Sequence, residues 1–266
     1  MKIPVLVTTE YAQAWLFTAR EIQILYQGDS VCIFMDVKQR ILALVTPQIG
    51  VSPLNVVIPA AAFPCPRLDD LDFSIAQIWN PYPVWERLSV SPFFDVLNDV
   101  CRETYTPGCW SYWLLEAIPS LSHYQNLIYE SAGEAIRKLL PAIADHREAE
   151  CVFAVRQIAG MGEGLTPAGD DWLMGCILAL HLLKKAALAR FIAAAAIPLT
   201  TPLSAAYLRA AGEGACSIHW HRLLQATDVD TFNQAAVAIA QQGHTSGNSA
   251  LAGFYVTLAE QCLMEK

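Results

Sequence analysis

The sequence predicts an α+β protein, in which a mostly antiparallel β-sheet or partial barrel is followed by an α-helical C-terminal domain. Two observations lead to this fold class. Up to about residue 90, short runs rich in Val, Ile and Leu alternate with turn-forming residues. From Ser91 onward, apolar residues recur at the spacing of one helix face. We therefore expect a β-rich domain at 1–90 and a helical domain at 91–266.

The N-terminal part contains the expected strands. They are the runs VLVTT, WLFTA, IQILY, VCIFMD, ILALVT and LNVVIP, together with the stretch from Phe73 to Trp79. Turn-formers such as Gly28 and Asp29, and the stretch from Pro47 to Gly50, separate them. Runs this short and this closely spaced favour a small antiparallel sheet.

The C-terminal part contains the expected helices. Ser91 is a candidate cap with Pro92 in the first turn, and an amphipathic helix is expected from Ser122 to Ala144. Further helices are expected at about 148–159, 170–187, 202–212, 228–241 and 247–264. An aromatic cluster of Trp110, Tyr112 and Trp113 is expected in the core or at an interface.

The composition excludes several classes of protein. Hydrophobic residues make up 54% and charged residues 16% of the chain, which excludes intrinsic disorder. A net charge of -8 without a basic run argues against nucleic acid as a partner. The apolar stretches are shorter than the roughly 20 residues of a membrane span, and no signal peptide is evident, so we expect a cytoplasmic protein outside the membrane. The apolar excess fits a large core or a homo-oligomeric interface equally well.

The eight cysteines show no metal-binding spacing. They are scattered along the chain without a Cys-x-x-Cys pair. In a cytoplasmic protein such residues are small buried thiols in most cases. We expect that role for them here.

The first candidate functional motif is GEGLTPAGDDWLMG, from Gly162 to Gly175. Gly164 and Gly169 permit tight turns and a close approach of the backbone to a ligand. Asp170 and Asp171 fall where the next helix begins, and one reading is that they only cap its free N–H groups. Two adjacent carboxylates cannot both cap, so one is expected to bind something else. One alternative is Mg²⁺ held through waters, although no third ligand is evident.

The second candidate motif is GHTSGNSALAG, from Gly243 to Gly253, and it resembles the first. Aligned on their last glycines, Gly247 matches Gly169 and Ser249 matches Asp171. Both motifs are turns that lead into an apolar helix, which indicates a divergent helical repeat. Equivalent loops of such a repeat are expected to face one pocket and to direct backbone N–H groups at an anion. His244 is either a structural residue or a hydrogen-bond donor or acid–base group.

The third candidate motif is TPLSAAYLRAAGEG, from Thr201 to Gly214. Ser204 is a candidate cap or ligand contact. Arg209 is a surface charge in one reading. In the other, because its helix is otherwise nearly uncharged, Arg209 has a buried anionic partner, which is either the Asp170 and Asp171 pair or a ligand carboxylate or phosphate.

These three segments together resemble the bacterial AllH-type family. Its motifs are Gly-Leu-Thr-Pro-x-x-Asp-Asp, Ser-x-x-x-Leu-Arg-x-Ala-x-x-Gly and Gly-His-Thr-Ser-Gly. Here they occupy Gly164–Asp171, Ser204–Gly214 and Gly243–Gly247, in the same order and with similar spacing. The N-terminal half is compatible with the family only in pattern. One departure is Ser249, where the family usually has an acid.

The resemblance implies a function. The family's named member is a subunit of oxamate carbamoyltransferase and works beside FdrA-like and AllG-like partner proteins. That enzyme interconverts carbamoyl phosphate plus oxamate with oxalurate plus phosphate in anaerobic allantoin and purine breakdown. The loss of the acid at Ser249 would suit a paralogue with another acceptor, or a non-catalytic subunit.

Three hypotheses follow for this chain. The first is a carbamoyltransferase subunit, the second a metabolite-binding subunit whose partner performs the chemistry, and the third a metal-dependent hydrolase built on the aspartate pair. The expected catalytic residues are Asp170, Asp171 and His244. The expected substrate-binding residues are Gly164, Thr166, Gly169, Ser204, Arg209, Thr245, Ser246 and Gly247.

Overall fold

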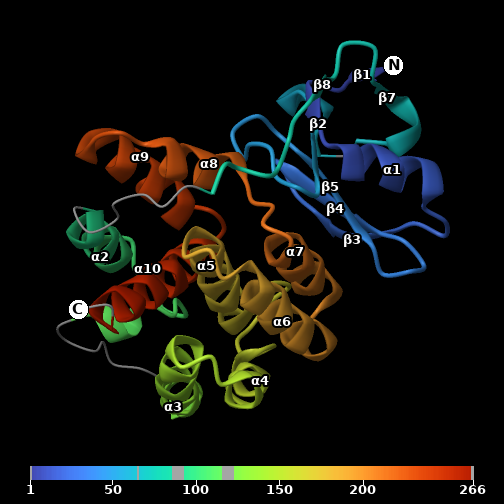
Figure 1. The fold of residues 1–266 in the computed structure, drawn as a ribbon. Helices are drawn as coiled ribbons and strands as arrows, with labels where there is room; N and C mark the ends of the chain where they lie inside the picture. The colour runs from blue at the N-terminus through green and yellow to red at the C-terminus, as the bar shows by residue number, and fades with distance from the viewer. Residues whose placement is uncertain (1, 65, 86–92, 116–122, 265–266) are drawn as a thin grey trace. The chain divides into compact units, whose positions relative to one another are not determined.

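A computed structural model describes residues 2–64, 66–85, 93–115 and 123–264 (Figure 1). The chain forms two compact units. Unit 1 contains Met1–Pro83 and Ala215–His221, and unit 2 contains Val84–Gly214 and Arg222–Lys266. The predicted α+β fold class is confirmed, since an open, mostly antiparallel sheet precedes a helical region. The expected division into domains at 1–90 and 91–266 stays a prediction.

Unit 1 is built on a six-stranded sheet with the order β3-β4-β5-β6-β2-β8. β3, β4 and β5 form an antiparallel meander, whereas β5 and β6 run parallel. β2 pairs antiparallel with β6 and parallel with β8, and the short strands β1 and β7 form a separate parallel pair. The strands are β1 (Ile3–Pro4), β2 (Val7–Thr8), β3 (Gln23–Gln27), β4 (Val31–Met35), β5 (Ile41–Val45), β6 (Asn55–Val57), β7 (Leu71–Asp72) and β8 (Gln77–Ile78).

The expected strand at WLFTA is wrong, because this run lies in helix α1 (Glu10–Thr18). Thr9 caps the helix by accepting a hydrogen bond from the Ala12 N–H. Ala12 and Trp15 lie three residues apart and are therefore buried together against one face of the sheet. Residues of alternating strand positions complete this core: Cys32, Phe34, Leu42, Leu44, Val56 and Ile58. A cap followed by two apolar positions at helical spacing outweighs the strand propensity of the run.

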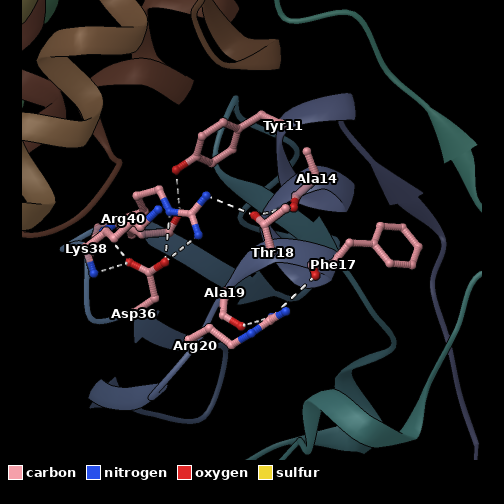
Figure 2. Close-up of polar contacts among 10 residues, drawn as sticks. Tyr11, Ala14, Phe17, Thr18, Ala19, Arg20, Asp36, Lys38 and Arg40 are labelled. Atoms are coloured by element: carbon pink, nitrogen blue, oxygen red, sulfur yellow. Dashed lines mark hydrogen bonds and ion pairs between the residues drawn. The ribbon is translucent and has the colours of Figure 1, made fainter.

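An ion pair connects the turn between β4 and β5 with the end of α1 (Figure 2). The Asp36 carboxylate is buried and accepts hydrogen bonds from the backbone N–H groups of Lys38 and Arg40, at 3.0 and 2.9 Å. The Arg40 guanidinium binds the same carboxylate and also donates to the Thr18 hydroxyl, at 2.9 Å. Burial by itself would raise the pKa of Asp36, but the hydrogen bonds and charge of Arg40 outweigh it and hold the pKa below its usual value.

The opposite face of the sheet is covered by a segment from the C-terminal half of the chain. Ile218 packs against the core cluster that contains Val45 and Val57. Its N–H donates to the Val51 carbonyl at 3.0 Å, and the Cys216 N–H donates to the Pro81 carbonyl at 2.9 Å. The segment Ala215–His221 therefore belongs to the sheet unit rather than to the helices that flank it in sequence.

Unit 2 is helical, and most of its helices lie where the sequence predicts them. The helix expected at 170–187 ends earlier, and two helices, α6 and α8, were not predicted from the sequence. The expected cap at Ser91 and Pro92, and Ser122, lie outside the described residues. The helices are α2 (Phe94–Glu103), α3 (His123–Ala144), α4 (Glu148–Ile158), α5 (Ala168–Leu182), α6 (Ala186–Ala196), α7 (Pro202–Gly212), α9 (Val229–Ala240) and α10 (Ser246–Met264), with α8 (Ile218–Gln225) beginning in unit 1 and ending in unit 2.

Two further expectations concern side-chain environment and the membrane. Six cysteines are buried free thiols, and Cys65 and Cys262 lie outside the described side chains. Trp110 is 1% exposed and packs edge-to-face on Trp113, with ring centroids 5.6 Å apart, so the aromatic cluster lies in a core.

No helix in the described part of the chain is long and apolar enough to cross a membrane.

Candidate ligand-binding site

The first and the last glycine motifs lie together in unit 2. The Thr166 hydroxyl, in the loop between α4 and α5, lies 2.9 Å from the Ser246 hydroxyl, which belongs to the first residue of α10. The residues are 80 positions apart in sequence. The hydrogen bond therefore brings the N-terminal ends of α5 and α10 to one place.

Behind this contact, α5 and α10 cross at a distance that only glycine permits (Figure 1). A Cβ on Gly175 would lie 1.8 Å from the Ala250 carbonyl oxygen, and one on Gly253 would lie 2.0 Å from the Trp172 carbonyl oxygen. Trp172 and Ala250 occupy equivalent positions when the two motifs are aligned. The glycine of each helix thus contacts the equivalent residue of the other helix. Such reciprocal contacts are what a helical repeat with approximate twofold symmetry predicts.

The glycines at the two helix starts serve packing rather than ligand access. The Gly169 N–H donates to the Met161 carbonyl, and the Gly247 N–H donates to the Gln242 carbonyl, both at 2.9 Å. A Cβ on Gly169 or Gly247 would lie 2.3 or 1.9 Å from a carbonyl oxygen of the preceding helix. The expectation that these two backbone amides point at a ligand is therefore wrong. Gly164, by contrast, is exposed, and a Cβ there would have no neighbour within 4 Å.

Asp170 connects the loop before α5 with the start of α7. Its side chain is buried, Oδ1 accepts the Gly160 N–H at 2.8 Å, and Oδ2 accepts the Thr200 hydroxyl. Burial raises the pKa of Asp170, and the hydrogen bonds from Thr200 and Gly160 offset part of that rise. Because both oxygens have protein partners, the structure favours a positioning role for Asp170. It also leaves the aspartate pair poorly arranged to offer two free carboxylates to one metal ion.

Asp171 is held by the protein less completely than Asp170. The residue is 6% exposed, and among the described residues its buried Oδ2 has no hydrogen-bond partner. Burial raises the pKa of Asp171 well above its usual value, the Ser246 hydroxyl lowers it in part, and the charge of Asp170 raises it further. Asp171 therefore lies beside Ser246, behind the pair of hydroxyl groups that joins the two motifs.

The α7 motif reaches the same place through its N-terminal end only. The Thr201 hydroxyl accepts the Ser204 N–H at 3.1 Å and donates to the Leu165 carbonyl at 2.6 Å. Ser204 is buried, and its hydroxyl lies near enough to Asp170 to favour the ionised carboxylate. Arg209 is exposed farther along α7. Its expected ion pair with the aspartates is wrong, because Gly160 and Thr200 hold Asp170 instead.

The α10 motif is open to solvent on one side. His244 is exposed, and its carbonyl oxygen accepts the Thr106 hydroxyl at 3.1 Å. Thr245 is half-buried, and its methyl group would lie 3.3 Å from a Cβ on Gly108. In the first motif, the loop residue Gly164 is exposed as well. Asp171 is thus buried, whereas His244 and Gly164 are exposed. A catalytic role for His244 remains a prediction.

The α10 motif is supported by a segment that was not predicted to contribute to the site. The Trp110 N–H donates to the Ser249 hydroxyl at 3.0 Å. Asn248 donates from Nδ2 to the Cys101 carbonyl and to the Thr104 hydroxyl, both at 2.9 Å. Thr200, the partner of Asp170, was missed as well. These contacts span more than a hundred residues or depend on a loop, and no local pattern in the sequence indicates them.

A group of metal-binding side chains is not found in the described part of the chain. There, no three or more His, Cys, Asp or Glu residues are placed to hold an ion together.

Comparison with known proteins connects this site with a family. Residues 158–258 match the sequence model of a family described as oxamate carbamoyltransferase subunit AllH. This region of the chain is therefore similar to the AllH family. The match extends from the end of α4 into α10 and contains all three motifs that meet at the site. Comparison with curated proteins and with solved structures gave no match.

Proposed function

We propose that this chain is a carbamoyltransferase subunit that acts on carbamoyl phosphate and a small anionic acceptor such as oxamate. One observation carries the proposal. The three motifs inside the AllH-family region meet at the junction of α5, α7 and α10, where Thr166 is hydrogen bonded to Ser246 beside the partly unpaired Asp171. Motifs separated by up to 80 residues converge in this way when they build one site.

The reaction suits the groups at this junction. The acceptor nitrogen attacks the carbamoyl carbon, a C–N bond forms, the C–O bond to phosphate breaks, and the proton lost by nitrogen ends on the departing phosphate. Both substrates are small anions. Helix N-termini carry partial positive charge, and hydroxyl groups donate hydrogen bonds, so both stabilise the negative oxygens of such ligands. We assign oxygen binding to Thr166, Thr245 and Ser246, with His244 as an exposed candidate group beside Thr245.

The proposed setting is a complex. A family described as a subunit acts together with other proteins, and we propose FdrA-like and AllG-like proteins as its partners, in the breakdown of allantoin and purines. The expected product is oxalurate when the acceptor is oxamate. A cytoplasmic location fits these metabolites.

A second candidate is a metabolite-binding subunit whose partner performs the chemistry. One observation favours it, namely the engagement of Ser249 with the Trp110 N–H at the position where the family usually has an acid. One of the two equivalent positions of the repeat is thereby occupied by the protein itself. In this case the chain would supply binding and the partner would supply the remaining reacting groups.

A reconstituted assay separates the two candidates. The chain is purified and tested alone, and then with the two partner proteins, for phosphate release from carbamoyl phosphate in the presence of oxamate. Turnover by the lone chain supports a catalytic subunit. A binding subunit is supported if the lone chain binds oxamate but turnover appears only after the partners are added.

Variants then test the site itself. Thr166→Val and Ser246→Ala each remove one hydroxyl and are expected to lower transfer about tenfold or more if it contacts a desolvated anion. Thr227→Val, which removes an exposed hydroxyl before α9, is the matched control and should behave like the parent. If both site variants retain parental transfer while folded, the assignment of the site is wrong.

A further inference from the structure

The equivalent positions of the repeat formed by α5 and α10 differ in how the protein holds their side chains. Asp170 and Asp171 in α5 are equivalent to Asn248 and Ser249 in α10. Asp170 is held by Gly160 and Thr200, Asn248 donates to the Cys101 carbonyl, and Ser249 accepts the Trp110 N–H. Among the described residues, two buried oxygens of these four side chains have no hydrogen-bond partner, Oδ2 of Asp171 and Oδ1 of Asn248. The Asn248 amide is anchored through Nδ2 to Cys101 and Thr104, whereas Asp171 contacts Ser246 of the hydroxyl pair that joins the two motifs.

A buried carboxyl oxygen without a partner is costly, and native proteins rarely leave one so. The Asp171 side chain lies at the junction of two long helix N-termini, next to the hydroxyl of Ser246, which itself is hydrogen bonded to Thr166. A ligand that binds these hydroxyl groups would lie next to Asp171. The missing hydrogen bond is therefore expected to come from that ligand.

The chemistry of Asp171 restricts the group that it can meet. Burial favours the neutral carboxylic acid, since no charge there has to be desolvated. A neutral acid offers an O–H donor and a carbonyl acceptor side by side. A carbamoyl group, H₂N–C=O, offers the complementary acceptor and donor. An ionised carboxylate would instead repel the negative charge that both proposed substrates carry.

We propose that Asp171 recognises the H₂N–C=O group of the bound substrate, with one hydrogen bond donated to its oxygen and one accepted from its nitrogen. This inference rests on the proposed function, because oxamate and carbamoyl phosphate share that group. Asp171 is then the residue that separates amides from ketones and acyl phosphates of the same shape and charge. Its equivalent, Ser249, has no part in recognition.

Matched ligand pairs test the proposal by binding rather than by turnover. Oxamate and pyruvate have the same charge and nearly the same shape and differ in NH₂ against CH₃. Carbamoyl phosphate and acetyl phosphate differ in the same way, so the two pairs show which substrate places its carbamoyl group at Asp171. Dissociation constants are measured by calorimetry, or by competition for the phosphates, with the chain alone and with the reconstituted assembly. In at least one pair, the parent should bind the amide about tenfold or more tightly than the methyl analogue.

Two substitutions at Asp171 make the test specific. Asp171→Ser introduces the residue that occupies the equivalent position of α10, Ser249, so a serine fits at this kind of helix start. The variant should bind the amide and the methyl analogue with dissociation constants within about threefold of each other. Asp171→Asn retains a donor and an acceptor and should keep most of the preference. Ser249→Ala is the control, which should leave the preference unchanged even if the Trp110 N–H loses its partner. Circular dichroism verifies that each variant is folded.

Several results would overturn the proposal. It fails if the parent shows no preference in either pair, if Asp171→Ser keeps the full preference, or if Asp171→Asn loses as much as Asp171→Ser. Transfer by the assembly without any such preference leaves the proposed function standing and removes only this inference. Absence of both transfer and binding removes the two together.

Discussion

The substitution Gly175→Ala should destabilise unit 2 although alanine is the better helix former. Gly175 lies inside α5, where replacement of glycine by alanine favours the helix by about 1 kcal/mol. The added Cβ would, however, lie 1.8 Å from the Ala250 carbonyl oxygen and 2.8 Å from the Phe254 backbone nitrogen. Both atoms belong to the backbone of α10, so no side chain can rotate away, and the helices themselves have to separate.

The size of the effect follows from these two opposing terms. The shorter contact must lengthen by about 1.2 Å to reach the 3.0 Å below which Cβ contacts are essentially not observed. Overpacking costs about 1–3 kcal/mol in most cores, and we take the upper end, about 3 kcal/mol, because the clash is with backbone atoms. With the helix propensity subtracted, the expected loss is about 2 kcal/mol, which lowers the melting temperature by about 4–8 °C for a unit of this size. Thermal unfolding followed by far-ultraviolet circular dichroism reports mainly on unit 2, which holds most of the helices.

Gly133→Ala provides the matched control. Gly133 also lies inside a helix, α3, but its added Cβ would come no closer than 3.4 Å to its nearest neighbour, the end of the flexible Arg137 side chain. Propensity then dominates, and the melting temperature should stay equal or rise by about 2–4 °C. A Gly175→Ala variant that melts at or above the parent would refute the close crossing of α5 and α10, and with it the geometry that places Thr166 beside Ser246.

Three further predictions concern buried polar groups. Asp171→Asn should raise the stability of unit 2 at neutral pH. The pKa of Asp171 is higher in the folded than in the unfolded chain, so the parent loses stability as pH rises above about 4, whereas an asparagine has no charge to bury. The melting temperatures of variant and parent should therefore converge below that pH. Asp36→Asn should lower the stability of unit 1 by about 2 kcal/mol at neutral pH, and since the pKa of Asp36 is lowered, the deficit should shrink as pH falls below about 4 in denaturant titrations. Thr200→Val leaves Asp170 with an unpaired buried oxygen and should cost about 1–3 kcal/mol by thermal melting, whereas a loss no larger than that of Thr227→Val would contradict the role given to Asp170.

The sequence was sufficient for much of the helical region because long apolar patterns with clear caps are local signals. The helix expected at 202–212 has these bounds as α7, and that expected at 228–241 differs from α9 by one residue at each end. α6 was missed because its alanine-rich sequence has little polar contrast. The break before it depends on Lys184, which adopts a left-handed backbone conformation with φ of 63°. Such a conformation is unusual for lysine, so the end of α5 could not be read from residue type.

The candidate site could be predicted in its parts but not in its assembly. The resemblance between the two glycine motifs indicated a repeat, and the Thr166 to Ser246 hydrogen bond agrees with the convergence expected from it. The different environments of Asp170 and Ser249 depend on Thr200 and Trp110, respectively, which come from other segments of the chain. The interpretation of Arg209 as a residue with a buried anionic partner was wrong, because Arg209 is exposed. A helix with few charges does not have to bury its one cationic side chain.

The crystallographic position of bound oxamate would show whether the junction of α5, α7 and α10 is the binding site. The chain, alone or in complex with its partner subunits, is crystallised with oxamate at a concentration that saturates binding in solution. The account predicts the ligand at the junction of α5, α7 and α10, within hydrogen-bond distance of the hydroxyl groups of Thr166 and Ser246 and of the Asp171 carboxyl. Oxamate bound in unit 1 or only on a partner subunit, with no contact to these three side chains, would contradict it.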